Sequence, residues 1–486
     1  MCIKYTNVRK NSRGNFKTPL KKNKKHSSNP FAQLKNRLWR GILSAKTFQE
    51  KKMDKSKLKN LASSRIDSRA DEFISSGEKL LRMPELSYCE NKTADFVEQI
   101  FSKIGLEVKK NLAITGLRAD LDTGRPGPKI AVLGELDGLI VPNHAFADPE
   151  THAAHACGHH AALNAMLGCA EILSQPEILQ HLSGSIAFIA TPSEECQNQP
   201  YIASLIEKGK LTFFGGKSQL IAEGVFDDID AAVMLHAGNS NFTPSGFNGF
   251  VMKRLEFNGR AAHAGAYPER GINAISMMRA ALGLIDYQRE TFRDEDHVRI
   301  HGYVSYGGEA VNVIPDRAEY TLQVRGGTPE SIKDASEKVD RCVQAAATAF
   351  GGQATVHNLF GFMPLVSYDA LDEIHRNNAE IIAPGVPFTK GIYRPSSTDM
   401  GDVSMIKPSL HAYFRGFAGT AHTDTFLAED PLAAYADSVK FLTFDVIDLL
   451  YGDAQTARQI AELPVPMTKA EYLKEMHSFS SVKHFS

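Results

Sequence analysis

Three short apolar runs, each followed at once by acidic residues or a histidine, constrain the fold of this chain most. Residues 130–133 lead into Glu135 and Asp137, residues 185–190 lead into Glu194 and Glu195, and the segment DAAVMLHAG ends in His236. Continuously apolar strands separated by helical segments are typical of a parallel sheet that is covered on both faces. Ligands bind beyond the carboxyl ends of such strands. The sequence therefore predicts an α/β domain whose functional side chains gather at one sheet edge.

A different order of elements follows within residues 249–359. The expected elements are a strand (249–258), a helix (272–290), two strands (297–306 and 318–325), a helix (329–350) and a strand (353–359). This β-α-β-β-α-β order is that of a ferredoxin-like unit. We therefore predict a first domain over residues 61–245 and 363–460, with helices over 66–82 and 92–104 and the sheet edge that carries the functional side chains. An inserted α+β domain over 246–362 interrupts it, and residues 461–486 form a tail.

The first 60 residues differ from the rest of the chain in charge. They hold 18 of the 55 Lys and Arg residues but only two of the 56 acidic ones. We interpret them as a disordered basic leader. The alternatives are a nucleic-acid arm, an organelle-targeting leader, or an extension upstream of a true start at Met53. Because the remaining chain is acidic, no nucleic-acid partner is expected.

Two further features bear on location. There is no run of 18 apolar residues and no signal-peptide pattern, so no membrane association is expected. The six cysteines are scattered along the 486 residues rather than grouped in a disulfide framework. Such sparse cysteines are typical of a reducing compartment, which predicts a cytoplasmic location.

The densest group of possible metal ligands lies in residues 152–160, which contain four histidines and a cysteine. Cys157 and His159 directly precede an amphipathic helix, and a helix N-terminus favours the thiolate form of cysteine. With Glu194, Glu195 and His236 at the same sheet edge, the donors suit zinc, cobalt or manganese. Of two adjacent carboxylates, one can bind metal while the other takes a proton. The alternatives are a buried thiol beside surface histidines, and a solvated carboxylate pair.

Nine motifs occur in order over residues 66–452. They are RMPELSYCENKTA, GELDGL, HACGHH, ATPSEE, MLHAG, GRAAHAGAYPERGINAI, GGEAVNVIPDRAEYTLQVR, SSTDMGDVS and AHTDTFLAED. Together they resemble the amidohydrolase branch of the zinc aminoacylase/carboxypeptidase superfamily. That branch includes auxin-conjugate hydrolases, aminobenzoyl-glutamate hydrolase and a related dipeptidase. GELDGL and SSTDMGDVS favour the group similar to aminobenzoyl-glutamate hydrolase.

The resemblance implies a mainly parallel-sheet metallohydrolase domain with an inserted ferredoxin-like dimerisation domain, and hence a homodimer. It also implies two divalent metal ions, with zinc first and manganese or cobalt as alternatives. The implied ligands are Cys157 (bridging), His159, Glu195, His236 and His422. Glu194 would be the general base and Asp137 a supporting acid near the metals. His160 stands where the branch usually has Asp or Asn.

Three residues of the inserted domain are given roles by the same resemblance. His263 would reach across a dimer interface to stabilise the oxyanion, while Asn312 and Arg325 would bind substrate. The guanidinium of Arg325 suits a carboxylate because it can form two parallel hydrogen bonds. The alternatives are an exposed histidine, a turn residue and a strand-end charge, respectively.

The expected activity is hydrolysis of the amide bond of an N-acyl amino acid or aminoacyl conjugate by a metal-activated water. A dipeptidase or carboxypeptidase that uses the same site on small peptides is the nearest alternative. A binding protein that keeps the fold without turnover and nucleic-acid binding through residues 1–60 are further alternatives.

Overall fold

A nine-stranded sheet forms the centre of the first domain in the computed structural model, which describes residues 53–486. Its strands, in spatial order, are β1 (Val108–Leu112), β2 (Gly116–Asp122), β6 (Ser185–Thr191), β3 (Lys129–Glu135), β7 (Ala231–Ala237), β15 (Ser409–Phe414), β8 (Asn241–Phe247) and β13 (Leu365–Val366), while β14 (Phe388–Arg394) also pairs with β8. The four strands β6, β3, β7 and β15 are parallel. Antiparallel strands extend the sheet on both sides of them. The predicted, mainly parallel sheet is therefore confirmed, and we call this part the sheet domain.

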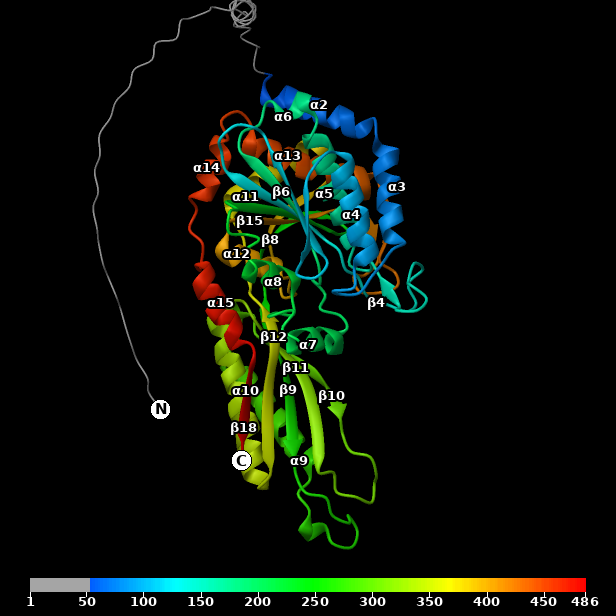
Figure 1. Cartoon of the computed structure of the whole chain (residues 1–486). Coiled ribbons are helices and arrows are strands. Elements are labelled where there is room, and N and C mark those ends of the chain that lie inside the picture. Colours follow the sequence, from blue (N-terminus) through cyan, green and yellow to red (C-terminus); the bar gives the residue numbers. More distant parts are fainter. Residues whose placement is uncertain (1–52) are drawn as a thin grey trace, which may run out of the picture. The chain divides into compact units, whose positions relative to one another are not determined.

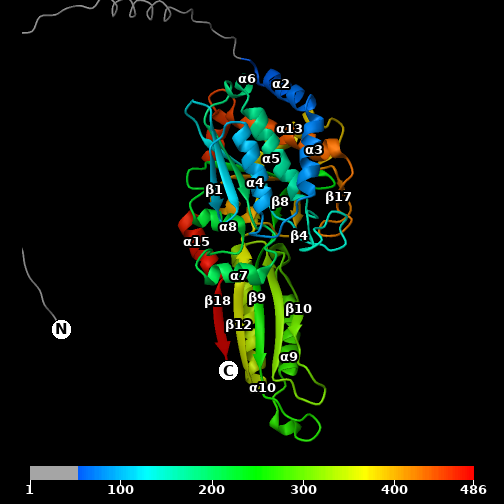
Figure 2. The ribbon, with the colours of Figure 1, turned by 45° about the vertical axis from the view of Figure 1, so that its right-hand side comes forward.

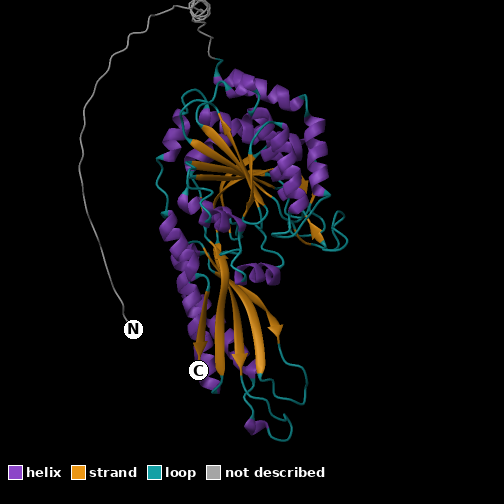
Figure 3. Ribbon diagram, in the orientation of Figure 1, coloured by secondary structure: helices purple, strands orange, loops and turns teal. Residues whose placement is uncertain are grey.

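Both faces of the central strands are buried. Along β3, Ile130 and Val132 join one hydrophobic core, and Ala131 and Leu133 join the other, because successive side chains of a strand point to opposite faces. The first core includes helices α2 (Lys55–Asp67), α3 (Ala70–Leu81), α4 (Asn91–Lys103), α5 (His159–Leu173), α6 (Pro176–Leu179), α11 (Asp369–Ile382), α13 (Ser438–Leu450) and α14 (Gln455–Ala461). The second includes α7 (Gln199–Glu207), α8 (Gly216–Ala222) and α12 (Met400–Ile406). Helices thus cover the sheet on both sides (Figure 3).

The inserted domain has the predicted order of elements. They are β9 (Gly249–Asn258), α9 (Ala274–Tyr287), β10 (Arg299–Tyr306), β11 (Arg317–Gly326), α10 (Pro329–Phe350) and β12 (Gln353–Phe362). The strands pair in the order β10-β11-β9-β12, which is that of a ferredoxin-like sheet. Helices α9 and α10 pack together beside this sheet (Figure 1). Among residues 53–486, no helix is long and apolar enough to cross a membrane.

The expected boundary of the basic leader at residue 60 is wrong. Helix α2 already begins at Lys55, where the side chain of Asp54 accepts a hydrogen bond from the backbone N–H of Lys57. Leu58, Ala62 and Ile66 are buried on one side of α2, and this burial holds the helix against the sheet domain. The expected disordered leader otherwise lies in residues 1–52, outside the described residues. The helix expected over 66–82 is α3, which begins at Ala70.

The expected tail over residues 461–486 is also structured. It contains α15 (Lys469–Ser478), whose Tyr472 and Met476 are buried, and β18 (Ser481–Phe485). Strand β18 pairs antiparallel with β12 from Ser481 opposite Asn358 to Phe485 opposite Ala354. It therefore adds a fifth strand to the sheet of the inserted domain (Figure 2). The sequence does not reveal this strand because three of its five side chains are exposed, and backbone hydrogen bonds make the pairing.

Deletion of residues 481–486 should destabilise the inserted domain and expose the edge of β12. We expect the free energy of unfolding to fall by about 2 kcal/mol, since a net backbone hydrogen bond contributes about 0.5–1.5 kcal/mol. The open edge should also promote association between chains. Thermal unfolding and size-exclusion chromatography measure both effects. Lys483→Ala is the matched control, because it removes the ion pair with Asp340 and keeps the strand; equal behaviour of the two variants would contradict the prediction.

Candidate metal centre

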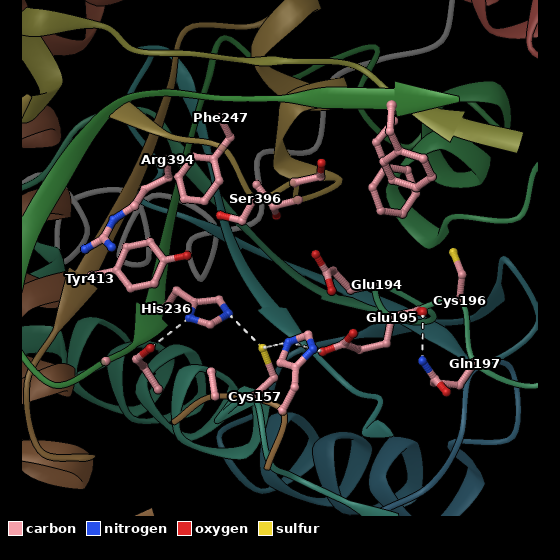
Figure 4. Close-up of a pocket in the computed structure, with 18 of the residues that line it drawn as sticks. Cys157, Glu194, Glu195, Cys196, Gln197, His236, Phe247, Arg394, Ser396 and Tyr413 are labelled. Atoms are coloured by element: carbon pink, nitrogen blue, oxygen red, sulfur yellow. Dashed lines mark hydrogen bonds and ion pairs between the residues drawn. The ribbon is translucent and has the colours of Figure 1, made fainter. Parts of the chain in front are cut away.

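Neighbouring parallel strands bring the predicted side chains to one edge of the larger sheet. Strand β6 precedes Glu194 and Glu195, strand β3 precedes Asp137, and His236 lies near the end of β7. Because β6, β3 and β7 are adjacent and parallel, their carboxyl ends coincide. Figure 4 shows Cys157 directed toward His236, with Glu194 and Glu195 nearby. This arrangement is the one that the strand endings predict.

A tight turn places Cys157 and His159 on either side of a glycine at the start of α5. Gly158 has a φ of 81°, in the left-handed region that favours glycine. A Cβ atom at this position would lie 2.3 Å from the Cβ of Ala237, at the end of β7. Only a residue without a side chain therefore allows the turn to approach β7 this closely.

Five side chains form two groups of possible metal ligands that share Cys157. Cys157 Sγ lies 3.4 Å from His236 Nε2 and 3.3 Å from His422 Nε2, and His422 Nε2 lies 3.4 Å from Glu195 Oε1. Within each group, the donor atoms lie within 4.8 Å of one another; the groups are Cys157, His159 and His236, and Cys157, Glu195 and His422. The loop between β16 (Phe417–Ala418) and β17 (Leu427–Ala428) supplies His422. The five predicted ligands are thus brought together.

Geometry and chemistry of these donors fit divalent metal ions. Two ligands at about 2.0–2.3 Å from one tetrahedral ion lie about 3.3–3.7 Å apart, which matches the distances around Cys157. His159 Nε2 and Glu195 Oε1 are buried atoms without a hydrogen-bond partner. Burial, followed by the charge of Glu195, raises the pKa of the Cys157 thiol well above its usual range. A cation bound beside Cys157 would favour its thiolate form.

Asp137 fixes the orientation of several of these residues. Its carboxylate accepts hydrogen bonds from the backbone N–H groups of Glu194 (3.1 Å) and Glu195 (3.0 Å) and from the hydroxyl of Ser87 (2.9 Å). Its backbone carbonyl oxygen lies 2.9 Å from Nδ1 of His159. Asp137 thus orients Glu194 and Glu195 through their backbone N–H groups and His159 through Nδ1. Hydrogen-bond partners of this kind orient the ligands of metal sites.

Glu194 has the environment expected of a proton acceptor. Its Oε2 lies 3.9 Å from His159 Nε2. Burial, followed by the charges of Glu195 and Glu135, raises the pKa of Glu194 well above its usual value. A carboxylate with raised proton affinity in a cleft is suited to taking a proton from water.

A buried lysine beside the centre was not predicted. Lys217 of α8 is fully buried, and its ammonium donates to Glu135 Oε1 at 2.6 Å and to Asp399. Burial would raise the pKa of Glu135, but Lys217 and His159 lower it to about 2. Nothing in the segment around Lys217 distinguishes it from a surface lysine at the start of a helix, so the sequence gives no signal for this role.

The centre opens into a cavity of about 590 Å³ between the sheet domain and the inserted domain. Its walls are rich in aromatic side chains, namely Phe242, Phe247, Phe250, Phe360, Phe362, Tyr413 and Phe426. Arg325, predicted to bind substrate, also lines it and donates to the side-chain oxygens of Gln323 (3.0 Å) and Ser397 (3.1 Å). Burial lowers the pKa of Arg325. Among the described residues no carboxylate pairs with Arg325, so the guanidinium can receive an anionic group.

His263 and Asn312 lie outside this cavity. Both are exposed, and the segments that carry them lie side by side in the inserted domain, where the backbone N–H of Ala264 donates to the carbonyl oxygen of Asn312 at 3.0 Å. The role of His263 across a dimer interface and the substrate-binding role of Asn312 stay predictions. His160 is not in either metal-binding group; its Nε2 lies 3.0 Å from the hydroxyl of Tyr435, away from the donors.

The mainly parallel sheet carries thiol, imidazole and carboxylate donors at one edge, and a ferredoxin-like domain faces the cavity beside them. This combination is that of a two-domain, metal-dependent hydrolase. Residues 245–350 match the family model described as a peptidase dimerisation domain. The chain is 26% identical to a mouse Xaa-Arg dipeptidase over 394 residues, which cover 76% of this chain and 82% of the relative. It is 29% identical to one p-aminobenzoyl-glutamate hydrolase polypeptide from Escherichia coli over 255 residues, which cover 49% and 53% of the two chains.

Solved structures agree on the fold. A putative aminohydrolase from methicillin-resistant Staphylococcus aureus superposes with a TM-score of 0.66 at 21% identity and covers 79% of this chain and 99% of that one. A dinuclear metal-binding peptidase of the M20 family from Bacillus subtilis gives a TM-score of 0.57 at 20% identity over 79% and 99% of the two chains. These structures show the fold, and together with the dimerisation-domain match and the curated relatives they confirm the predicted resemblance to the zinc aminoacylase/carboxypeptidase superfamily and the predicted class of metal-dependent amidohydrolase.

Gly158→Ala should disturb both stability and the metal centre. The left-handed backbone of a non-glycine residue costs about 1–3 kcal/mol, and the close approach to Ala237 adds steric overlap. Gly105→Ala is the matched control, because Gly105 has a φ of 82° but nothing within 4 Å of the added Cβ. We expect Gly158→Ala to lower unfolding free energy more than the control and to reduce bound metal, as measured by urea denaturation and elemental analysis. Normal metal content in Gly158→Ala would contradict the prediction.

Proposed function

We propose that this chain hydrolyses the amide bond of an N-acyl amino acid or aminoacyl conjugate at a centre of two divalent metal ions. Two donor groups that share Cys157, with Glu194 beside them, support this proposal most directly. Cys157, His159 and His236 would hold one ion, and Cys157, Glu195 and His422 the other. This mixture of thiolate, imidazole and carboxylate suits zinc best, and manganese or cobalt are alternatives.

Bound there, two such ions would polarise the substrate carbonyl and lower the pKa of water. Glu194 takes the proton of the attacking water and later returns it to the leaving nitrogen. Asp137 holds Glu194 and Glu195 through their backbone N–H groups, so the proton acceptor and the metal ligand keep their relative positions. The aromatic walls of the cavity exclude water from the acyl side of the substrate.

Arg325 would bind the carboxylate of the released amino acid. Its guanidinium lies in the cavity wall, and its hydrogen bonds go to neutral side-chain oxygens. Arginine binds a carboxylate through two parallel hydrogen bonds. Asn312 would assist in substrate binding from the partner of a homodimer, together with His263.

A dipeptidase or carboxypeptidase activity is the second candidate. The similarity to a mouse Xaa-Arg dipeptidase favours it, because that relative covers a larger part of this chain than the aminobenzoyl-glutamate hydrolase polypeptide does. Assays of N-acyl amino acids beside dipeptides that release the same amino acid separate the two activities. We also propose a cytoplasmic location, which the unpaired state of the five described cysteines supports.

Glu194→Gln should abolish most of the activity while the metal ions stay bound. Loss of a general base lowers kcat by about 10²–10⁴-fold, and Glu194 is not needed as a ligand. Kinetic assays with elemental analysis of the same sample measure both quantities. Glu195→Gln is the matched neighbour and should lose bound metal as well as activity. Substantial activity of metal-loaded Glu194→Gln would contradict the assignment of the base.

A mixing experiment tests whether His263 acts across a homodimer. His263→Ala and Glu194→Gln chains should each be nearly inactive alone. After unfolding and refolding together, half of the dimers are mixed, and one site in each then combines an intact Glu194 with the partner's intact histidine. We expect about a quarter of the wild-type activity to return, as random pairing into two-fold dimers predicts. If His263 acts within its own chain, no activity returns on mixing.

A further inference from the structure

Glu135 is a buried carboxylate that has a hydrogen-bond donor at one oxygen and none at the other. It is the last residue of β3 and is fully buried. Its Oε1 accepts a hydrogen bond from the ammonium of Lys217 at 2.6 Å. Its Oε2 lies 3.3 Å from Nε2 of His159, and both of these facing atoms lack a hydrogen-bond partner.

The neutral form of His159 cannot donate a hydrogen bond to Glu135. Nδ1 of His159 lies 2.9 Å from the backbone carbonyl oxygen of Asp137. A carbonyl oxygen only accepts, so Nδ1 carries the proton of the neutral ring and Nε2 presents a lone pair. Two electron pairs that face each other at 3.3 Å repel, and burial removes the water that would screen them. Either a second proton on Nε2 or a metal ion in contact with both atoms removes this repulsion.

The spacing of the two atoms is that of two ligands of one ion. Cys157 Sγ lies 3.3 Å from His422 Nε2 and 3.4 Å from His236 Nε2. The distance of 3.3 Å between His159 and Glu135 falls in the same range. Two nitrogen or oxygen donors at about 2.0–2.1 Å from a tetrahedral ion are about 3.3–3.4 Å apart.

We propose that Glu135 is a further ligand of the metal centre on its His159 side and that Lys217 positions it. This assignment rests on the proposed two-metal function. Lys217 is fully buried and pairs with Asp399 as well as Glu135. The ammonium holds Oε1 of Glu135 and thereby turns Oε2 toward His159. Hydrogen bonds to the outer oxygen of a ligating carboxylate orient it in this way in metal sites.

Lys217 also balances the charge at this position. Oxygen atoms of Glu135, Glu194 and Asp399 lie within 4.8 Å of one another, and three ionised carboxylates so close repel one another. The ammonium of Lys217 compensates part of this charge, and the ion beside His159 compensates the rest. Glu135 can therefore stay ionised in the interior of the sheet domain.

Zinc binding to full-length Glu135→Gln tests this proposal. Metal is removed with a chelator, Zn²⁺ is returned in a titration, and bound Zn²⁺ is counted by elemental analysis and calorimetry. We expect wild type to bind two Zn²⁺ ions. The variant should keep the ion on the His422 side and bind the other about tenfold or more weakly, the usual effect of losing a residue that supports a metal site. The absorption spectrum of the Co²⁺ form should change as well.

Asp340→Asn is the matched control. Asp340 accepts a hydrogen bond at 2.6 Å from the buried Lys253 in the inserted domain, so this variant removes a similar carboxylate–lysine contact away from the metal centre. It should bind both Zn²⁺ ions as wild type does. Glu135→Gln is expected to fold, because Lys217 keeps Asp399 as its partner. If it does not fold, Glu135→Asp keeps the charge, withdraws the oxygen from His159 and should weaken the same ion.

Two results would overturn the assignment, and they are distinguishable. If Glu135→Gln binds two Zn²⁺ ions with wild-type affinity and an unchanged Co²⁺ spectrum, Glu135 is not a ligand and contacts His159 only in the metal-free chain. If wild type itself binds no Zn²⁺, Mn²⁺ or Co²⁺, the proposed two-metal function is wrong, and the assignment of Glu135 is wrong with it.

Discussion

Compensation of buried negative charge is the requirement on which the rest of the sheet edge depends. Glu135, Asp137, Glu195 and Asp399 are buried or nearly so within a few residues of neighbouring strand ends. A buried carboxylate is strongly destabilising unless it is paired or hydrogen-bonded. Backbone N–H groups satisfy Asp137, and Lys217 pairs with Glu135 and Asp399. Glu195 Oε1 has no hydrogen-bond partner but lies 3.4 Å from His422 Nε2, so a cation between these two atoms would compensate the remaining charge.

The two domains contribute differently to the site. Every donor of the two metal-binding groups comes from the sheet domain, on strand ends, the start of α5 or the loop after β16. The inserted domain instead supplies Met252, Gln323, Arg325 and Phe360 to the wall of the cavity. The possible metal ligands therefore all lie in the sheet domain, whereas the inserted domain contributes to the shape and charge of the cavity. Variation in the inserted domain can thus change specificity without altering the metal ligands.

The sequence predicts the donors better than the network that supports them. Cys157, His159 and the strand-end residues are recognisable because each follows a local pattern, either an apolar run or a helix start. The contact among Glu135, Lys217 and Asp399 joins segments 82 and 182 residues apart, and no periodicity connects them. Strand β18 escapes prediction for another reason: its outer side chains are mostly exposed, so backbone pairing rather than an apolar pattern defines it. Long-range polar contacts and edge strands are therefore recognised only in the three-dimensional structure.

The charged and aromatic side chains around the cavity bear on the chemical class of substrate that it can bind. Arg325 and Arg394 both line it, and among the described residues neither forms an ion pair with a carboxylate. Each guanidinium instead lies over a ring, Arg325 over Phe250 and Arg394 over Phe242. Two guanidinium groups without a carboxylate partner attract the carboxylate of a substrate. The aromatic walls meanwhile suit an uncharged acyl group. The lining therefore suits a substrate with an apolar part and an anionic amino-acid part.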